Sequence, residues 1–262
     1  MKNLVLGNSH DNLKLAVIKT GSNRLIKQAK KQQDFFIQNN IDNISTPIIY
    51  NINDNNIIME YIDGYNFINY LLNNNTKNIF TKLFTSLLDY VQDNINKQKR
   101  CDIEIFHGCV IDKIKLLDIE YKIKNKLIEK TLEIETTYTG VCHGDLTLAN
   151  TIIYNDKLYL LDFLPVFFET PIQDIIKLRQ DTKYLWSLIL LYGGLDNHPI
   201  KVLKKIEELD NILLNRFKPI INSDIYKILE IINYYRIIPY TRNQQTVCYI
   251  KDIIEQLCKN IL

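Results

Sequence analysis

The alternation of apolar and polar residues predicts a strand near the amino terminus that ends on a lysine. In residues 13–19, LKLAVIK, positions 13, 15 and 17 are Leu, Leu and Val, and Lys19 falls on the same face. Because this is the apolar face, the pattern directs a cation toward the interior. The alternative interpretation is a strand-end lysine whose ammonium group reaches back to water.

A helix is predicted directly after this strand. Ser22 or Asn23 can cap its first turn. Apolar residues then recur at roughly helical spacing up to about residue 39, at Leu25, Ala29 and Phe36. We expect these three side chains to face the core.

Two short strands, 48–51 and 57–61, follow this helix and end at the break Asp63-Gly64. From residue 79 to 95 the apolar residues instead recur at i, i+3 and i+4, which predicts a long amphipathic helix. We therefore expect an α+β protein with a small sheet lobe at 1–63 and a larger helical lobe at 64–262. Further helices are expected near 107–130, 171–192, 199–215, 223–236 and 244–261.

Composition and charge exclude several classes of protein. The chain has 262 residues, and its 46% of hydrophobic residues are enough for a sizeable core. Its 32 basic and 30 acidic residues are scattered and leave a net charge of +2, so nucleic-acid binding is not expected. No apolar run approaches the roughly 18 residues of a membrane span, and the stretch MKNLVLGNSHDN does not resemble a secretory signal. We expect a cytoplasmic protein without a membrane span.

The cysteines indicate neither a disulfide framework nor a zinc site. Their number is odd, and none of them forms a CxxC pair. We expect buried or free thiols at Cys101, Cys109, Cys142, Cys248 and Cys258.

A hairpin is predicted near the middle of the chain, in the stretch CHGDLTLANTIIYNDKLYLLDF. Asn155-Asp156 suits a two-residue turn between the strands 151–154 and 157–161, which are rich in β-forming residues. Residue 154 is then expected to pair with residue 157.

Polar side chains are expected to meet at the open end of this hairpin. Counting back along the ladder places Asn150 opposite Leu161, and Ala149 opposite Asp162. Asn150 and Asp162 should then lie about 4.5–8 Å apart. Amide and carboxylate oxygens are ligands that Mg²⁺ prefers, so we expect these two residues to hold a Mg²⁺ ion that bridges nucleotide phosphates. Asp145 could face the same spot as a base that orients a hydroxyl group.

A plainer interpretation of Asp145, Asn150 and Asp162 is a turn in which Asp and Asn side chains bond their own backbone. That interpretation accounts for each residue but not for the convergence of all three. His143, two residues before Asp145, has two interpretations: it either takes part in the chemistry or holds the loop by a hydrogen bond.

The strings HGDLTLAN, 143–150, and LLDF, 160–163, resemble a known family. They are similar to the catalytic loop and metal-binding strand of the kinase-like small-molecule phosphotransferases, the aminoglycoside phosphotransferase and choline kinase group. The resemblance implies a bilobal protein-kinase-like fold with an abbreviated N-terminal sheet lobe. It also implies ATP in the cleft between the lobes and a small-molecule hydroxyl acceptor near Asp145. Protein kinases usually carry Arg at the position of Gly144, and no Ala-Pro-Glu follows Phe163, so protein substrates are less expected.

Other segments match the same family pattern. Lys19, in AVIK, matches the strand lysine that contacts nucleotide phosphates. PIQDI, 171–175, resembles the segment in which Asp174 supports the catalytic loop. MEYIDG, 59–64, resembles the hinge whose backbone holds adenine, which implies nucleotide binding by Met59, Glu60, Tyr61 and Ile62.

Three departures from the family pattern are visible. Gln28 stands in the helix where the family often has a glutamate that pairs with the lysine. Few residues precede the lysine strand, and Gly7 to Asn12 is expected to be an abbreviated phosphate-covering loop or to leave that cover absent. Asp162-Phe163 continues with Leu164 rather than Gly.

The resemblance implies an ATP-dependent phosphotransferase acting on a hydroxyl group of a small metabolite. The segment 162–186 resembles kinase-like proteins associated with bacterial surface-glycan synthesis, which favours a sugar or an amino alcohol. The alternative is an inactive pseudokinase that binds nucleotide or acts as a scaffold. Candidate acceptor contacts, for which surface salt bridges and core tyrosines are the alternative interpretation, are Arg179, Gln180, Asp181, Tyr235, Arg236, Tyr240 and Arg242.

Overall fold

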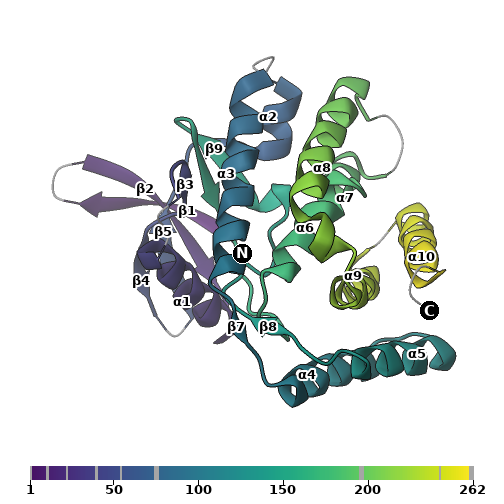
Figure 1. The fold of residues 1–262 in the computed structure, drawn as a ribbon. Helices are drawn as coiled ribbons and strands as arrows, with labels where there is room; N and C mark the ends of the chain where they lie inside the picture. Colours follow the sequence, from purple (N-terminus) through teal and green to yellow (C-terminus); the bar gives the residue numbers. More distant parts are fainter. Residues whose placement is uncertain are drawn as a thin grey trace. The chain divides into compact units, whose positions relative to one another are not determined.

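The contacts in the computed structural model divide the chain into two compact units. The helices and strands of both are labelled in Figure 1. The first combines Met1–Gln92 with His143–Pro165, and the second combines Asp93–Cys142 with Val166–Leu262. The predicted lobes 1–63 and 64–262 were drawn where the apolar pattern changes after the break Asp63-Gly64, and these bounds stay a prediction. The residues that the structure describes are 2–9, 12–21, 23–38, 41–53, 55–73, 77–194, 198–241 and 243–259.

An antiparallel sheet in the first unit has the strand order β1-β2-β5-β4. The predicted lysine strand lies inside this sheet as β2, where Lys19 is opposite Ile57 of β5. The other two predicted strands are also present, as β4 and β5. The bounds are β1 Lys2–Ser9, β2 Asn12–Thr20, β4 Ile49–Ile52 and β5 Asn56–Glu60.

The stretch from Gly7 to Asn12 is mostly strand rather than loop, and its role as a phosphate cover stays a prediction. Gly7 to Ser9 end β1, and Asn12 begins β2, with Ser9 opposite Asn12 in the ladder. The intervening residues 10 and 11 lie outside the described residues. β1 escapes detection because the strand is defined by pairing of its backbone with β2, and its sequence has no clear alternation.

Helix α1 (Asn23–Gln38) packs on this sheet. Ala29 forms a buried cluster with Ile57 and Met59, and Leu25 packs against it. The predicted cap Ser22 lies outside the described residues. The expected core position Phe36 is wrong, because its side chain is 52% exposed while Phe35 is buried. One residue is a rotation of about 100° around a helix, which is enough to exchange the two faces.

A second sheet in the first unit contains the predicted hairpin and has the strand order β3-β10-β9-β6. β9 (Thr151–Tyr154) pairs with β10 (Lys157–Leu160), and Tyr154 is opposite Lys157 as predicted. Asn155 and Asp156 both have positive φ, which a two-residue turn of this kind requires. The pattern missed the two-residue edge strands β3 (Ile44–Ser45) and β6 (Tyr65–Asn66).

The long amphipathic helix is confirmed as α3 (Lys77–Asn96), and its apolar stripe is buried. It is preceded by α2 (Phe67–Asn73), which the sequence pattern did not reveal. A helix of this length spans only two turns, too few for a helical period to be recognised.

The second unit is mainly helical. The predicted segment 107–130 is two helices, and segment 171–192 is also broken, at Leu185, which has a φ of 59°. A left-handed residue cannot continue an α-helix, and nothing in the local composition announces it. The elements are β7 Lys99–Arg100, α4 Ile103–Lys115, α5 Tyr121–Leu132, β8 Tyr138–Thr139, α6 Ile172–Thr182, α7 Trp186–Tyr192, α8 Ile200–Ile221, α9 Asp224–Ile237 and α10 Gln244–Lys259.

Among the described residues, none of the helices combines the length and the apolar character that crossing a membrane requires.

Gly64 is expected to be essential for stability because it lies directly against the hairpin. A Cβ atom added there would stand 2.4 Å from the carbonyl oxygen of Ile153 and 2.6 Å from Cγ2 of Ile152. We predict that Gly64→Ala lowers the free energy of unfolding by about 1–3 kcal/mol. Urea denaturation followed by circular dichroism measures this change.

Gly108→Ala is the matched control, because a Cβ atom at this position in α4 would have nothing within 4 Å. Alanine should raise the free energy of unfolding there by about 0.5–1 kcal/mol. Equal stability of Gly64→Ala and the wild type would show that the hairpin does not approach Gly64 this closely.

Candidate active site

The end of the hairpin holds the predicted polar residues in a defined arrangement. The backbone N–H of Leu161 donates to the carbonyl of Asn150 at 2.9 Å, which confirms that these residues are opposite each other. Ala149 does not continue the ladder, because residues Leu148–Asn150 form a turn of 3₁₀ helix. The predicted pairing of Ala149 with Asp162 is therefore wrong. The tight turn bends the chain away from the strand direction one residue earlier than the ladder count assumed.

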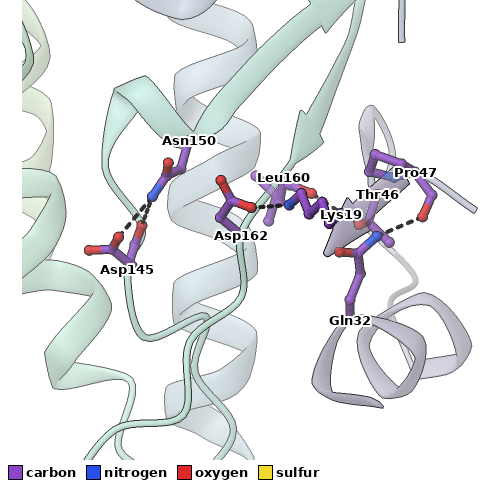
Figure 2. Close-up of polar contacts among 8 residues, drawn as sticks. All are labelled: Lys19, Gln32, Thr46, Pro47, Asp145, Asn150, Leu160 and Asp162. Carbon is purple, nitrogen blue, oxygen red and sulfur yellow. Dashed lines mark hydrogen bonds and ion pairs between the residues drawn. The ribbon is translucent and has the colours of Figure 1, made fainter. Parts of the chain in front are cut away.

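Asn150 is bonded to the predicted base Asp145. Its Nδ2 donates to the backbone carbonyl of Asp145 at 2.8 Å and to the carboxylate Oδ2 at 3.0 Å (Figure 2). An amide that donates both hydrogens to one residue presents its oxygen on the other side. Figure 2 shows that oxygen directed away from Asp145, where it can serve as a ligand. One side chain thus holds the base and offers a hard oxygen ligand.

Asp162 follows Leu161, the ladder partner of Asn150, and is bonded to Lys19 (Figure 2). The lysine Nζ donates to Oδ1 across a separation of 143 residues. The side chain of Lys19 is 15% exposed and that of Asp162 is 33% exposed. Asp162 has a φ of 59°, an uncommon conformation for a residue other than glycine, and such conformations concentrate at functional sites. Lys19 is therefore not a strand-end lysine that reaches back to water.

A small pocket in the first unit adjoins this ion pair. Lys19 and Asp162 line it together with Gln28, Met59 and Phe163. Gln28 is neutral, so α1 brings no carboxylate to this pocket. The lysine finds its ion-pair partner at the end of the hairpin instead.

Two hydrogen bonds brace the hairpin against α1 through the segment Thr46-Pro47. Thr46 donates from Oγ1 to the carbonyl of Leu160 at 3.0 Å, and Gln32 donates from Nε2 to the carbonyl of Pro47 at 2.7 Å (Figure 2). Thr46 and Gln32 are buried. These bonds hold the strand that leads into Asp162.

His143 holds the loop that carries Asp145. Its ring is fully buried and stacks on Phe163 with centroids 4.2 Å apart, and Nδ1 accepts the backbone N–H of Asp145 at 3.2 Å. Burial lowers the pKa of His143 to about 4, so the ring is neutral near pH 7. This supports the predicted hydrogen-bonding role rather than direct chemistry. Gly144 has a φ of 86°, which explains the absence of a side chain there.

The predicted hinge lies at the end of β5, and its backbone is partly committed to the sheet. The N–H of Glu60 donates to the carbonyl of Ile48 at 2.8 Å, and the N–H of Tyr61 donates to that of Leu15 at 3.2 Å. Met59 and Ile62 are buried, and Met59 forms part of the pocket wall. If this segment holds adenine, other backbone groups than these two N–H groups make the contact.

The first group of predicted acceptor contacts is buried rather than on the surface. Arg179 is 5% exposed in α6, and Nε lies 3.7 Å from Oδ1 of Asp210, which also accepts a hydrogen bond from Thr182 at 2.6 Å. Burial opposes the charge of Arg179, but Tyr226, Glu230 and Asp210 together raise the pKa of its guanidinium. Arg179 thus belongs to an internal network of the second unit.

Gln180 and Asp181 belong to the same interior. Gln180 accepts a hydrogen bond from Asn233 at 2.8 Å, and Asp181 accepts the backbone N–H of Ser187 at 2.8 Å. Both are 1% exposed. The alternative of surface salt bridges is therefore wrong for this group. Buried polar side chains are held by mutual hydrogen bonds, which leaves them poorly placed to contact an acceptor.

The second group is divided among different environments. Tyr240 is 80% exposed, and the guanidinium of Arg236 lies 5.6 Å from the ring centre of Phe167. Burial raises the pKa of Tyr235 to about 12. Arg242 lies outside the described residues.

Asp174 is completely buried in the first turn of α6. Its support of the catalytic loop stays a prediction. One contact that the sequence pattern did not reveal comes from α1: Lys31 donates from Nζ to the carbonyl of Leu164 at 3.0 Å. The lysine follows Gln28 by three residues, so helical spacing alone places it on the same side of α1.

Neither a known family model nor a curated protein sequence matches this chain. Solved structures match its fold. A thermostable mutant of the aminoglycoside phosphotransferase APH(4)-Ia, in a ternary complex with AMP-PNP and hygromycin B, has a TM-score of 0.63 and 8% identity, over 98% of this chain and 94% of that chain.

Two further solved structures are similar to this chain. A glucosamine kinase in complex with glucosamine, ADP and inorganic phosphate has a TM-score of 0.54 and 9% identity, over 98% of this chain and 79% of that chain. A putative fructosamine-3-kinase from Haemophilus somnus 129PT has a TM-score of 0.54 and 14% identity, over 98% of this chain and 88% of that chain. The chain therefore has the kinase-like fold that the sequence motifs predict.

Proposed function

We propose that this chain, which shares its fold with small-molecule kinases, is an ATP-dependent phosphotransferase that moves the γ-phosphoryl group to a hydroxyl group of a small metabolite. One observation carries the proposal: the hairpin end brings together Asn150 bonded to Asp145 and Asp162 bonded to Lys19 (Figure 2). A turn that only satisfied its own backbone would not require a lysine from a strand 143 residues away.

The residues at the hairpin end fit a magnesium ion. Asn150 offers an amide oxygen and Asp162 a carboxylate, which are hard oxygen ligands of the kind that Mg²⁺ takes. Mg²⁺ is commonly held by one or two protein groups, with water and phosphate oxygens as its other ligands. Bound there, the ion would neutralise the charge of the phosphates during transfer. The described residues hold no cluster of three or more His, Cys, Asp or Glu side chains that would compete for it.

Lys19 adds a second positive charge on the nucleotide side of the site. Its ammonium group is bonded to Asp162 in the structure and can contact a phosphate oxygen when nucleotide is present. The arrangement therefore positions the phosphates and neutralises their charge, which is the main requirement of phosphoryl transfer.

Asp145 orients the acceptor. Its carboxylate accepts the proton of the acceptor hydroxyl group while the hydroxyl oxygen forms a bond to the γ-phosphorus, and the bond from that phosphorus to the ADP oxygen breaks. Asn150 fixes the carboxylate by its bond to Oδ2, and His143 fixes the backbone. Both contacts reduce the movement needed to reach the reactive geometry.

We propose a sugar or an amino alcohol as the acceptor, possessing a free hydroxyl group, with the reaction taking place in the cytoplasm. The similar glucosamine kinase was solved with glucosamine and ADP, and the aminoglycoside phosphotransferase with hygromycin B, so this fold accommodates sugar-like acceptors in those proteins.

A second candidate function is nucleotide binding without catalysis, as a scaffold or pseudokinase. The observation that favours it is the neutral Gln28 in the pocket, which leaves Lys19 paired with the predicted metal ligand Asp162. An enzyme and a scaffold both bind nucleotide, so only turnover separates them.

A screen for acceptor-dependent ADP release tests the proposed function. We expect ATP with Mg²⁺ to raise the melting temperature, since ligand at 100 times its Kd stabilises the folded state by about 2.7 kcal/mol. We then expect ADP release with at least one compound among sugars, choline-like alcohols and aminoglycosides. Stabilisation by nucleotide with no turnover on any class would favour the scaffold, and the absence of both would contradict either function.

A further inference from the structure

Helix α1 contacts the segment after Asp162 at two points on one face. Lys31 donates from Nζ to the carbonyl of Leu164 at 3.0 Å. One helical turn later, Phe35 packs on Phe163 with ring centroids 5.1 Å apart. Residues four apart lie on the same side of a helix, so both contacts are made by the face that also carries Gln28.

Leu164 links this helix to the catalytic loop. Its own N–H donates to the carbonyl of His143 at 2.9 Å, while its carbonyl accepts the bond from Lys31. Phe163, which Phe35 contacts, stacks on the ring of His143. The helix therefore reaches His143 by a hydrogen-bonded route and by an aromatic route.

His143 connects this contact to the predicted base, Asp145. Its Nδ1 accepts the backbone N–H of Asp145, and Asn150 donates to the carboxylate of the same aspartate. An unbroken series of hydrogen bonds thus runs from the ammonium group of Lys31 through Leu164 and His143 to Asp145. Every member belongs to the first compact unit.

The contact made by Lys31 is of a strong kind. A hydrogen bond from an ammonium group is generally stronger than one between neutral groups, and this one is partly buried. Lysine is rarely held in such a position without a partner, because removing its charge from water is unfavourable. A bond to a backbone carbonyl also fixes the chain at that point, whichever side chain residue 164 carries.

We propose that Lys31 is a positioning residue that holds Leu164, and through it His143 and Asp145, in the geometry that phosphoryl transfer requires. This inference rests on the proposed function for its catalytic consequence. Its structural half, the coupling of α1 to the 143–150 loop, does not require turnover. In this way α1 would hold the 143–150 loop through the ammonium group of Lys31. Its neutral Gln28 does not form an ion pair with Lys19, which is bonded to Asp162 instead.

Hydrogen–deuterium exchange of the protein without ligand tests the coupling. In Lys31→Met, which keeps a long side chain but lacks the ammonium group, we expect the amides of the 143–150 segment to exchange about tenfold faster than in the wild type. Lys30→Met is the matched control, because Lys30 is an exposed lysine of the same helix. Lys31→Arg retains a donor and should restore most of the protection.

Steady-state kinetics then test the catalytic half. Misplacing a reacting group by about 1 Å costs up to about 100-fold in rate, so we expect Lys31→Met to lower kcat by about 10- to 100-fold with KM for ATP changed less than about twofold. Lys30→Met should leave both constants unchanged. Lys31→Gln, which lacks the positive charge and whose side chain is too short to replace the ammonium group, should change kcat in the same direction and serves if Lys31→Met does not fold.

Two outcomes would overturn the inference. One is unchanged exchange at 143–150 in Lys31→Met. The other is faster exchange spread evenly over the first unit, which would mean that Lys31 contributes only to general stability. If Lys31→Met shows the local exchange effect but the wild-type protein has no turnover, the proposed function is contradicted and the coupling is supported.

Discussion

Replacing Asp145 by asparagine should lower kcat by about two to four orders of magnitude, the usual contribution of a positioned proton acceptor. Asparagine keeps the size of the side chain and an oxygen that can accept the bond from Asn150, but it cannot take the proton of the acceptor hydroxyl group. Because the hydrogen-bonded arrangement survives, the free energy of unfolding should change by less than about 0.5 kcal/mol. Acceptor-dependent ADP release measures kcat, and urea denaturation measures the stability.

The matched control for this substitution is Asp156→Asn, at the other end of the same hairpin. Asp156 has a φ of 58°, a conformation in which asparagine is well tolerated. The control should keep wild-type turnover. If Asp145→Asn turned over as fast as Asp156→Asn, Asp145 would not be the base, and the mechanism proposed for this site would be wrong.

The second large effect is expected at Asp162. We predict that Asp162→Asn lowers kcat/KM by about 100- to 1000-fold and removes most of the increase in ADP affinity that Mg²⁺ produces in the wild type. The substitution removes the negative charge of Asp162, which is both the predicted metal ligand and the ion-pair partner of Lys19. Asparagine tolerates the left-handed backbone of residue 162. The loss of kcat/KM would therefore result from the missing charge rather than from backbone strain.

Isothermal titration calorimetry with ADP, with and without Mg²⁺, measures this effect independently of catalysis. Asp34→Asn, at an exposed position of α1, is the control and should retain the full response to Mg²⁺. An undiminished Mg²⁺ response in Asp162→Asn would place the metal elsewhere and would remove the role that we assign to the hairpin end.

The local geometry of the hairpin follows from its own sequence. Asn155-Asp156 specifies a two-residue turn, and this turn sets the pairing of Tyr154 with Lys157. Once that pair is known, counting along the ladder places Asn150 opposite Leu161. The count fails one step later, at Ala149, because a 3₁₀ turn depends on the hydrogen bonds available beyond the strand and not on the period of the strand.

The partners of the charged residues did not follow from the sequence. Lys19 was expected to contact phosphates and Asp162 a metal ion, and the structure pairs them with each other. Gln28 showed that the helix lacks the carboxylate that often pairs with the strand lysine. It did not indicate which other group would pair with Lys19. Helical spacing placed Lys31 on the side of α1 that carries Gln28, but a lysine on an amphipathic helix is normally interpreted as a solvated residue.

The helical segments show the same division. The stripe of α3 is periodic over several turns, and its apolar residues are buried as predicted. In α1 the stripe is shorter, and Phe36 was assigned to the core in place of Phe35. The interior of the second unit differs most, because Arg179, Gln180 and Asp181 have the composition of a surface but find their polar partners inside the protein.

The sequence by itself determined the strand that carries Lys19, the hairpin and its turn, the long helix and the set of polar residues to which we propose to assign phosphoryl transfer. These features depend on neighbouring residues and on the periods of strands and helices, which are local properties of the chain. The tertiary structure alone decided that Lys19 pairs with Asp162, that Lys31 holds Leu164 and that the polar residues of α6 are buried. Each of these depends on which distant groups meet in space, and a charged or polar side chain accepts many partners until the fold selects one.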